Sequence, residues 1–171
     1  MTEIKEGAIT FRFDAGAEPQ QYDEWRFYRD RFERVVNDTK AMDILCLEGE
    51  TLWLIEVKDY RAHPRTKPSE IADELARKLR DTLAGLAAAR IHAHKEVERR
   101  FAERALRSAE MRVVLHLEQP EKPRRLFPNI VNPANLQEKL KQRLRSAVDN
   151  HPKVVSCNSF LRNRYCWSPS C

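Results

Sequence analysis

The chain has 171 residues, of which 42% are hydrophobic and 33% charged, and its formal net charge is +5. This length suits one hydrophobic core and is short for two, so we expect a single domain over residues 1–171. The presence of only 4 glycines excludes a low-complexity or loop-rich chain. The 31 basic residues favour a polyanionic partner, although 26 acidic residues make the surface mixed.

The N-terminal residues contain no apolar run, and no stretch of the sequence approaches the ~20 apolar residues that span a bilayer. We therefore expect a cytoplasmic protein with no membrane partner. Residues 8–13 alternate weakly and predict an edge strand, followed by a loop at Gly16 and Pro19. From Tyr22 the hydrophobic residues recur at three- and four-residue steps, which predicts a core-facing helix. Its stripe is Trp25, Tyr28, Phe32, Val35 and Val36.

A β-hairpin is predicted next, with strands over residues 41–47 and 51–58 around the turn Glu48-Gly49-Glu50. Ser69 is a good N-cap for a long helix that continues to about residue 108, with a break near residues 89–93. A strand follows at residues 111–117, a helix begins at Pro133, and residues 153–157 predict a last strand. This order indicates an α/β fold in which helices flank a small mixed sheet.

The four cysteines show neither paired metal-ligand spacing nor a dense disulfide framework. Cys46 lies in an apolar strand and is expected in the core. Cys157, Cys166 and Cys171 crowd the C-terminus. A zinc site is the alternative there, but without paired ligand spacing we expect free thiols and assign no structural metal. The five histidines are assigned no chemistry.

The second hairpin strand places charges within an apolar segment. Because side chains alternate along a strand, Leu54, Glu56 and Lys58 share one face. A two-residue turn with Gly49 first would place Asp43 directly opposite Glu56. Two opposed carboxylates repel, so a bound cation is the simplest reason for the arrangement.

Magnesium suits such a pair because it takes carboxylate ligands and keeps several waters. We expect Asp43 and Glu56 to hold Mg²⁺, with Mn²⁺ as an alternative ion, and Lys58 to assist the attacking water. The alternative is an exposed strand edge carrying one surface ion pair.

Asp43, twelve intervening residues and then Glu56-Val57-Lys58 resemble the signature of the PD-(D/E)XK nuclease superfamily, which includes restriction endonucleases. Met42 stands where the motif has proline. The resemblance implies a restriction-endonuclease-like core over about residues 22–117, with residues 118–171 as an elaboration. It also implies a Mg²⁺-dependent endodeoxyribonuclease that hydrolyses phosphodiester bonds of DNA.

Family members often add an acid from the first helix, and the resemblance makes Glu24 the candidate here. Strand-end and loop cations are candidates for contacting nucleic-acid phosphates, although ordinary surface polarity explains them equally well. These candidates are Lys40, Arg61, Arg65, Lys67 and Arg77. A homodimer or a partner protein would supply sequence specificity. The competing hypothesis is a catalytically silent nucleic-acid-binding or protein-interaction module on the same fold.

Overall fold

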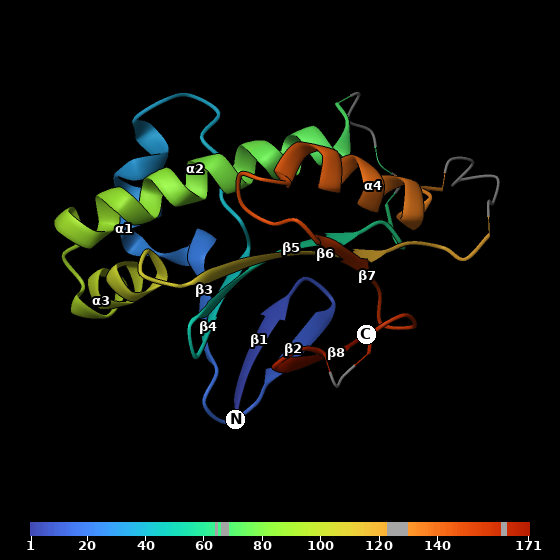
Figure 1. Ribbon diagram of the computed structural model, residues 1–171, viewed down its shortest axis with the longest axis horizontal. Helices are drawn as coiled ribbons and strands as arrows, with labels where there is room; N and C mark the ends of the chain where they lie inside the picture. Colours follow the sequence, from blue (N-terminus) through green and yellow to red (C-terminus); the bar gives the residue numbers. More distant parts are fainter. Residues whose placement is uncertain (64, 66–68, 123–129, 162–163) are drawn as a thin grey trace.

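A five-stranded mixed sheet forms the middle layer of the computed structural model, which describes residues 1–63, 65, 69–122, 130–161 and 164–171. Its strand order is β3-β4-β5-β6-β7, and a smaller sheet has the order β1-β2-β8. Helices cover one face of the large sheet, and the small sheet packs on the other (Figure 1). The described part of the chain is therefore a mixed α/β fold, as the sequence predicts.

The strands are β1 (Thr2–Glu6), β2 (Ile9–Phe13), β3 (Glu18–Gln21), β4 (Ile44–Glu48), β5 (Thr51–Asp59), β6 (Glu110–Glu118), β7 (Lys153–Val155) and β8 (Trp167–Ser170). The helices are α1 (Arg26–Asp30), α2 (Ile71–His92), α3 (Glu96–Ala105) and α4 (Pro133–Leu144), with 3-10 turns η1 (Tyr22–Glu24) and η2 (Phe32–Arg34).

The predicted hairpin is confirmed in its register. β4 and β5 are antiparallel, with Ile44 opposite Ile55 and Glu48 opposite Thr51. Gly49 has φ +56, the left-handed conformation that the first central residue of this two-residue turn requires. Continuing the register by one residue places position 43 opposite position 56. The turn therefore fixes which side chains meet beneath the helices.

Strand β5 lies inside its sheet, paired with β4 and, in parallel, with β6. Hydrophobic clusters on the helical side and on the side of the small sheet bury its two faces. Leu54 packs in the hydrophobic cluster under the helices. Ile55 packs in the second cluster, against the small sheet. The predicted alternation is confirmed, and Glu56 consequently points toward the helical layer with Leu54.

The continuous helix predicted from Tyr22 is wrong. The segment is broken into η1, α1 and η2, with extended backbone at Trp25 (ψ 133). Val35 and Val36, expected in the core, are 69% and 65% exposed. The kink lets the Trp25 ring pack edge-on against Phe101, 5.6 Å away, so tertiary aromatic packing overrides the helical period.

The N-terminal prediction also needs correction. β2 is not an edge strand but the centre of the small sheet, between β1 and β8. Residues 18–21, expected as a loop, form β3, whose Pro19 is tolerated because β3 is an edge strand. β1 and β8 were not predicted, because each is short and gains its hydrogen bonds only from β2.

The later elements follow the sequence closely. α2 ends at His92 and α3 begins at Glu96, near the expected break, although the N-cap of α2 is Glu70 rather than Ser69. α4 begins at Pro133 with the Asn132 side chain capping it. The region beyond residue 117 contributes a strand to each sheet, β7 and β8.

Among the described residues, no helix combines the length and the apolar character needed to cross a membrane. The cytoplasmic location stays a prediction.

Gly85 marks the closest approach between α2 and the N-terminal turns. A Cβ at Gly85 would overlap the Tyr22 hydroxyl and lie 3.2 Å from the Phe32 ring. Tyr22 is fully buried, so its ring has little freedom to move away. The position therefore requires glycine for packing, although glycine is a poor helix former.

We predict that Gly85→Ala lowers the free energy of unfolding by about 1–3 kcal/mol, because overpacking outweighs the gain in helix propensity. Urea denaturation measures the change. Ala87→Gly, at an exposed position of the same helix, should cost only about 1 kcal/mol. A stabilised Gly85→Ala variant would contradict the close packing of α2 on Tyr22.

Candidate functional site

Two acids and two lysines form an ion-pair cluster between the hairpin and α2. The Lys78 ammonium lies 3.0 Å from Asp43 Oδ1 and 2.6 Å from Glu56 Oε1. Lys58 lies 2.7 Å from Glu56 Oε1. The structure thus brings together the predicted residues Asp43, Glu56 and Lys58, and it adds Lys78 between the two carboxylates.

Backbone hydrogen bonds hold Asp43 at the entrance to β4. Its Oδ2 accepts a hydrogen bond from Val57 N at 2.7 Å, which links the two strands beyond their last ladder pair. Its carbonyl oxygen accepts one from Tyr22 N at 3.0 Å. One residue earlier, Met42 N donates to Thr82 Oγ1 on α2 at 2.9 Å. Contacts with β5, η1 and α2 therefore hold the backbone and the side chain at this position.

Burial dominates the electrostatics of Glu56, whose side chain is 1% exposed. Loss of hydration, and then repulsion from Asp43, raise the pKa of Glu56 to about 7, although Lys78 and Lys58 oppose the shift. Burial lowers the pKa of Lys78, but Glu56 and Asp43 outweigh it and hold that pKa above its ordinary value. Lys78 is therefore a permanent cation beside an acid that titrates near neutrality.

Two further acids face this cluster. Burial and the neighbouring Asp43 raise the pKa of Asp23 to about 6. The pKa of Glu6 is raised by the same two causes. Glu24, the acid expected from the first helix, is exposed and pairs with Arg29. Because the expected helix is broken at Trp25, Asp23 rather than Glu24 is the η1 acid that interacts most strongly with Asp43.

A cation does lie between Asp43 and Glu56, and it is the Lys78 ammonium. The carboxylate pair that suggested a metal is thus neutralised within the chain by Lys78 and Lys58. The assignment of Mg²⁺ or Mn²⁺ to Asp43 and Glu56 stays a prediction.

Lys78 and Asp23 were missed in the sequence for identifiable reasons. Only Arg77, the neighbour of Lys78, was a candidate, for a phosphate contact on the polar face of the helix, and Lys78 was not assigned to the acid site. Its spacing from Leu75 and Thr82, both buried, places it instead on the inner face of α2. This spacing could have identified Lys78 as an inward-facing residue. No sequence pattern could have identified Asp23, because its position depends on the break in the predicted helix.

The predicted phosphate contacts fall into separate places. Lys40 and Arg77 line one hollow of about 460 Å³ between α2 and residues 32–40, together with Arg80. Arg61 is held by Asp59, 2.6 Å away. Lys67 lies outside the described residues.

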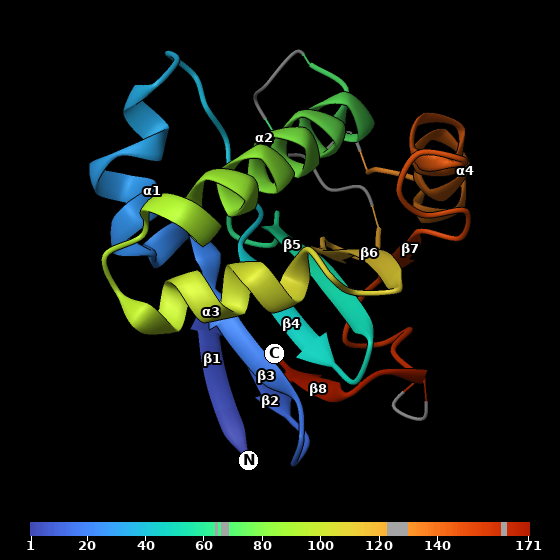
Figure 2. The ribbon, with the colours of Figure 1, turned by 60° about the vertical axis from the view of Figure 1, so that its left-hand side comes forward.

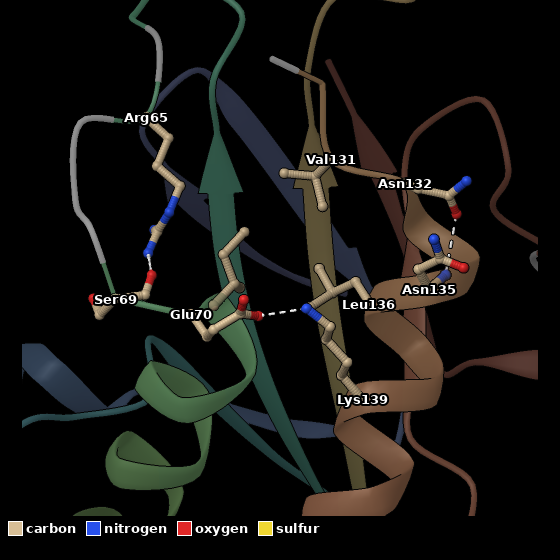
Figure 3. Close-up of a pocket in the computed structure, with 9 residues that line it drawn as sticks. Arg65, Ser69, Glu70, Val131, Asn132, Asn135, Leu136 and Lys139 are labelled. Carbon is tan, nitrogen blue, oxygen red and sulfur yellow. Dashed lines mark hydrogen bonds and ion pairs between the residues drawn. The ribbon is translucent and has the colours of Figure 1, made fainter.

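Arg65 lines a second hollow, of about 350 Å³, between the N-terminal ends of α2 and α4. It donates to the Ser69 carbonyl oxygen (Figure 3). It also pairs with Glu74 at 2.7 Å. On the opposite side, Lys139 reaches from α4 to Glu70, also 2.7 Å away. Both cations are engaged within the chain. In the first hollow Arg80 pairs with Asp81 at 2.9 Å and Lys40 lies 4.0 Å from Asp38, so Arg77 is the cation there without an ion pair among the described residues.

The C-terminal cysteines differ from expectation. Cys157 and Cys171 form a disulfide, whereas free thiols were predicted. The contact joins segments that follow β7 and β8, in different sheets, which no local spacing could indicate. Cys46 is fully buried as predicted, and its sulfur lies 3.9 Å from that of Cys166.

Comparison with known proteins gives one informative similarity. The chain is 33% identical over 166 residues to a cysteine–tRNA ligase of Neisseria meningitidis serogroup A / serotype 4A (strain DSM 15465 / Z2491). The alignment covers 80% of this chain but only 24% of that ligase, so the chain spans about a quarter of its relative. No family model and no solved structure matches.

This similarity overturns the predicted activity. The relative is a ligase named for tRNA, whereas the sequence was interpreted as a Mg²⁺-dependent endodeoxyribonuclease acting on DNA. The nuclease function and enzyme class are therefore wrong. Two features led to that interpretation: acids that oppose each other across a hairpin, and a lysine beside them. A buried ion-pair cluster that holds a helix on a sheet has the same two features.

We predict that Lys78→Met lowers the free energy of unfolding by about 3–5 kcal/mol, because it leaves two neighbouring buried carboxylates without their shared cation. Methionine keeps most of the apolar bulk of lysine, so the loss of stability can be attributed to the missing positive charge. The matched control is Arg77→Met at the adjacent exposed position, which should change stability by less than about 0.5 kcal/mol. Equal effects of the two substitutions would show that the cluster is not structural.

The raised pKa of Glu56 predicts a pH-dependent stability. Between pH 4.5 and 7 the folded chain keeps the Glu56 proton and the unfolded chain loses it, so rising pH destabilises the fold. Relative to wild type, Glu56→Gln should gain up to roughly 3 kcal/mol across this window. Urea unfolding at several pH values measures the difference. Glu138→Gln, on the exposed side of α4, should follow wild type. If the stability of wild type and of Glu56→Gln changed with pH in the same way, the raised pKa of Glu56 would be contradicted.

Proposed function

We propose that this chain is a tRNA-binding module of a cysteine–tRNA ligase system. The observation that carries this proposal is the 33% identity to a cysteine–tRNA ligase over 80% of the chain. The net charge of +5 is consistent with a polyanionic ligand. A nucleic-acid-binding role without hydrolysis also agrees with the use of Lys78 to neutralise the acid pair.

The proposed role is binding rather than ligation. The chain corresponds to 24% of its relative, so most of that ligase has no counterpart here. The sequence also has no glycine-rich phosphate loop. A separate ligase chain or segment would therefore supply the chemistry, and this module would add contacts to the RNA.

The hollow beside α2 is the RNA-contact surface that we infer. Phe32 and Val36 line it together with the cations Lys40, Arg77 and Arg80. The acids Asp38 and Asp81 also line it and pair with Lys40 and Arg80, so Arg77 is the cation that the proposal depends on. Cations neutralise phosphates, while aromatic and apolar surfaces accept unstacked bases, which are the features that proteins read in RNA loops. Among the described residues Arg77 has no ion-pair partner, so its guanidinium is free for a phosphate.

The acid–lysine cluster has a supporting role in this proposal. Lys78 ties α2 to the hairpin from the inner side, and its neighbour Arg77 projects from the exposed side of the same turn. The rigid inner contact limits the motion of the outer cation. The resemblance of Asp43, Glu56 and Lys58 to the PD-(D/E)XK pattern then becomes a hypothesis about the scaffold, with a restriction-endonuclease-like core that no longer serves hydrolysis.

We predict that Arg77→Ala weakens tRNA binding and reduces the slope of log K against log salt by about 0.7–0.9, the value for one lost phosphate contact. Fluorescence anisotropy with a cysteine tRNA transcript at several salt concentrations measures both quantities. The control is Lys141→Ala. Lys141 is an exposed cation of α4, which lies across α2 from residues 32–40 (Figure 2).

Three outcomes are informative. Loss of affinity for Arg77→Ala but not Lys141→Ala supports the hollow as the contact surface. Equal losses for the two variants would place the RNA elsewhere. Wild type that binds duplex DNA of the same length as tightly as tRNA, or that binds neither, would overturn the proposed function.

A further inference from the structure

Four side chains that can ligate metal converge beside the end of β6. His116 and Glu118 are two residues apart on that strand, so they share a face. Cys157 follows β7, the neighbour of β6, and Cys171 follows β8 of the small sheet. One ligand atom from each of the four residues lies within 4.8 Å of the others. The cluster is separate from Asp43 and Glu56.

The cluster reaches from a buried strand to the surface, because Cys157 is half-buried and Cys171 is exposed. His116 is 0% and Glu118 is 7% exposed. His116 Nε2 lies 2.9 Å from Glu118 Oε1 and 3.9 Å from Cys157 Sγ. Glu118 Oε1 also accepts a hydrogen bond from Cys157 N at 2.6 Å. Phe11 packs edge-on against the imidazole, with 5.2 Å between ring centroids, and so fixes its orientation.

We propose that the reduced chain binds one Zn²⁺ ion through His116, Glu118, Cys157 and Cys171. Two thiolates, an imidazole and a carboxylate are ligands that zinc takes in four-coordinate sites. Zn–S bonds of about 2.3 Å and Zn–N or Zn–O bonds of about 2.0–2.1 Å require ligand atoms about 3.3–3.8 Å apart in a tetrahedron. The observed separations, up to 4.8 Å, need only small side-chain movements to reach this geometry.

The disulfide between Cys157 and Cys171 is the metal-free, oxidised form of the same site. A dithiol reductant cleaves the S–S bond: two electrons pass to the cysteines, two protons give two thiols, and the reductant becomes its own disulfide. Zn²⁺ then displaces the two thiol protons and forms two Zn–S bonds. Metal and disulfide are therefore mutually exclusive, and each joins the C-terminus to β6 in a different redox state.

The charge balance favours a cation at this place. Two thiolates and the Glu118 carboxylate carry three negative charges around one ion of charge +2. Arg61 lies near both His116 and Glu118, but its ion-pair partner Asp59 also acts on His116, so the two charges largely cancel at the site. The site also has a structural consequence, because Cys157 and Cys171 belong to segments that end in different sheets. Zinc would hold the small sheet to the edge of the large one without the disulfide.

Metal titration of the full chain in both redox states tests the proposal. Protein reduced with a phosphine and freed of metal should bind one equivalent of Zn²⁺. It should also bind Co²⁺ with the absorption bands of tetrahedral thiolate ligation. The oxidised protein should bind neither ion at the same concentration. Reduced wild type that binds no metal at micromolar concentration, or oxidised protein that binds it equally well, would overturn the proposal.

Substitutions locate the ion. Cys171→Ser changes an exposed terminal residue, so it should fold, and in the reduced state it should lose at least about a hundredfold in Zn²⁺ affinity. Cys166→Ala removes a buried thiol of the same C-terminal segment that lies outside the cluster, and it should retain the affinity. Circular dichroism checks that both variants are folded. Equal losses in the two variants, or no loss in Cys171→Ser, would refute the assigned ligands.

Discussion

The buried ammonium of Lys78 is the contact on which the arrangement of helix and hairpin depends. It lies between Asp43 and Glu56, carboxylates that would otherwise repel each other beneath α2. Without this cation Asp43 would lose its ion pair with Lys78 and Glu56 would keep only the one with Lys58. Incompletely neutralised charges are among the most costly defects of a protein interior. The ion pairs also determine which face of α2 packs against β4 and β5. The exposed face of that helix is thereby held in a defined orientation.

The central hairpin makes this contact possible because it is buried on both sides. β5 carries Leu54 and Glu56 toward the helices and Ile55 toward the small sheet. A shift of one residue would exchange these faces and bury a carboxylate between the two sheets. Gly49, in its left-handed conformation, prevents this shift by fixing a two-residue turn. A local backbone requirement thus determines where the charged residues lie, and through them where α2 packs.

The charges that suggested a nuclease serve two different purposes in proteins. Opposed acids with a lysine can hold a metal for hydrolysis, or they can form a closed ion-pair network. Lys78, supplied by a helix distant in sequence, closes the network here. Similarity to part of a cysteine–tRNA ligase then directs attention from the buried acids to the exposed cations, of which Lys40 and Arg77 share one hollow. The cluster of His116, Glu118, Cys157 and Cys171 is separate from the buried acids and from this hollow.

Local sequence patterns were enough to predict the hairpin, its register, the alternation of β5 and the approximate positions of α2, α3, β6 and α4. These depend on interactions between near neighbours: the turn at Gly49, the cap at Asn132 and regular hydrophobic spacing. The acids Asp43 and Glu56 were found for the same reason. Tertiary structure alone decided the break at Trp25, the pairing of β1 and β8 with β2, and the meeting of Cys157 with Cys171. It also decided that Lys78 would neutralise the acids. Each of these contacts joins segments far apart in the chain, whose free energy no local pattern contains.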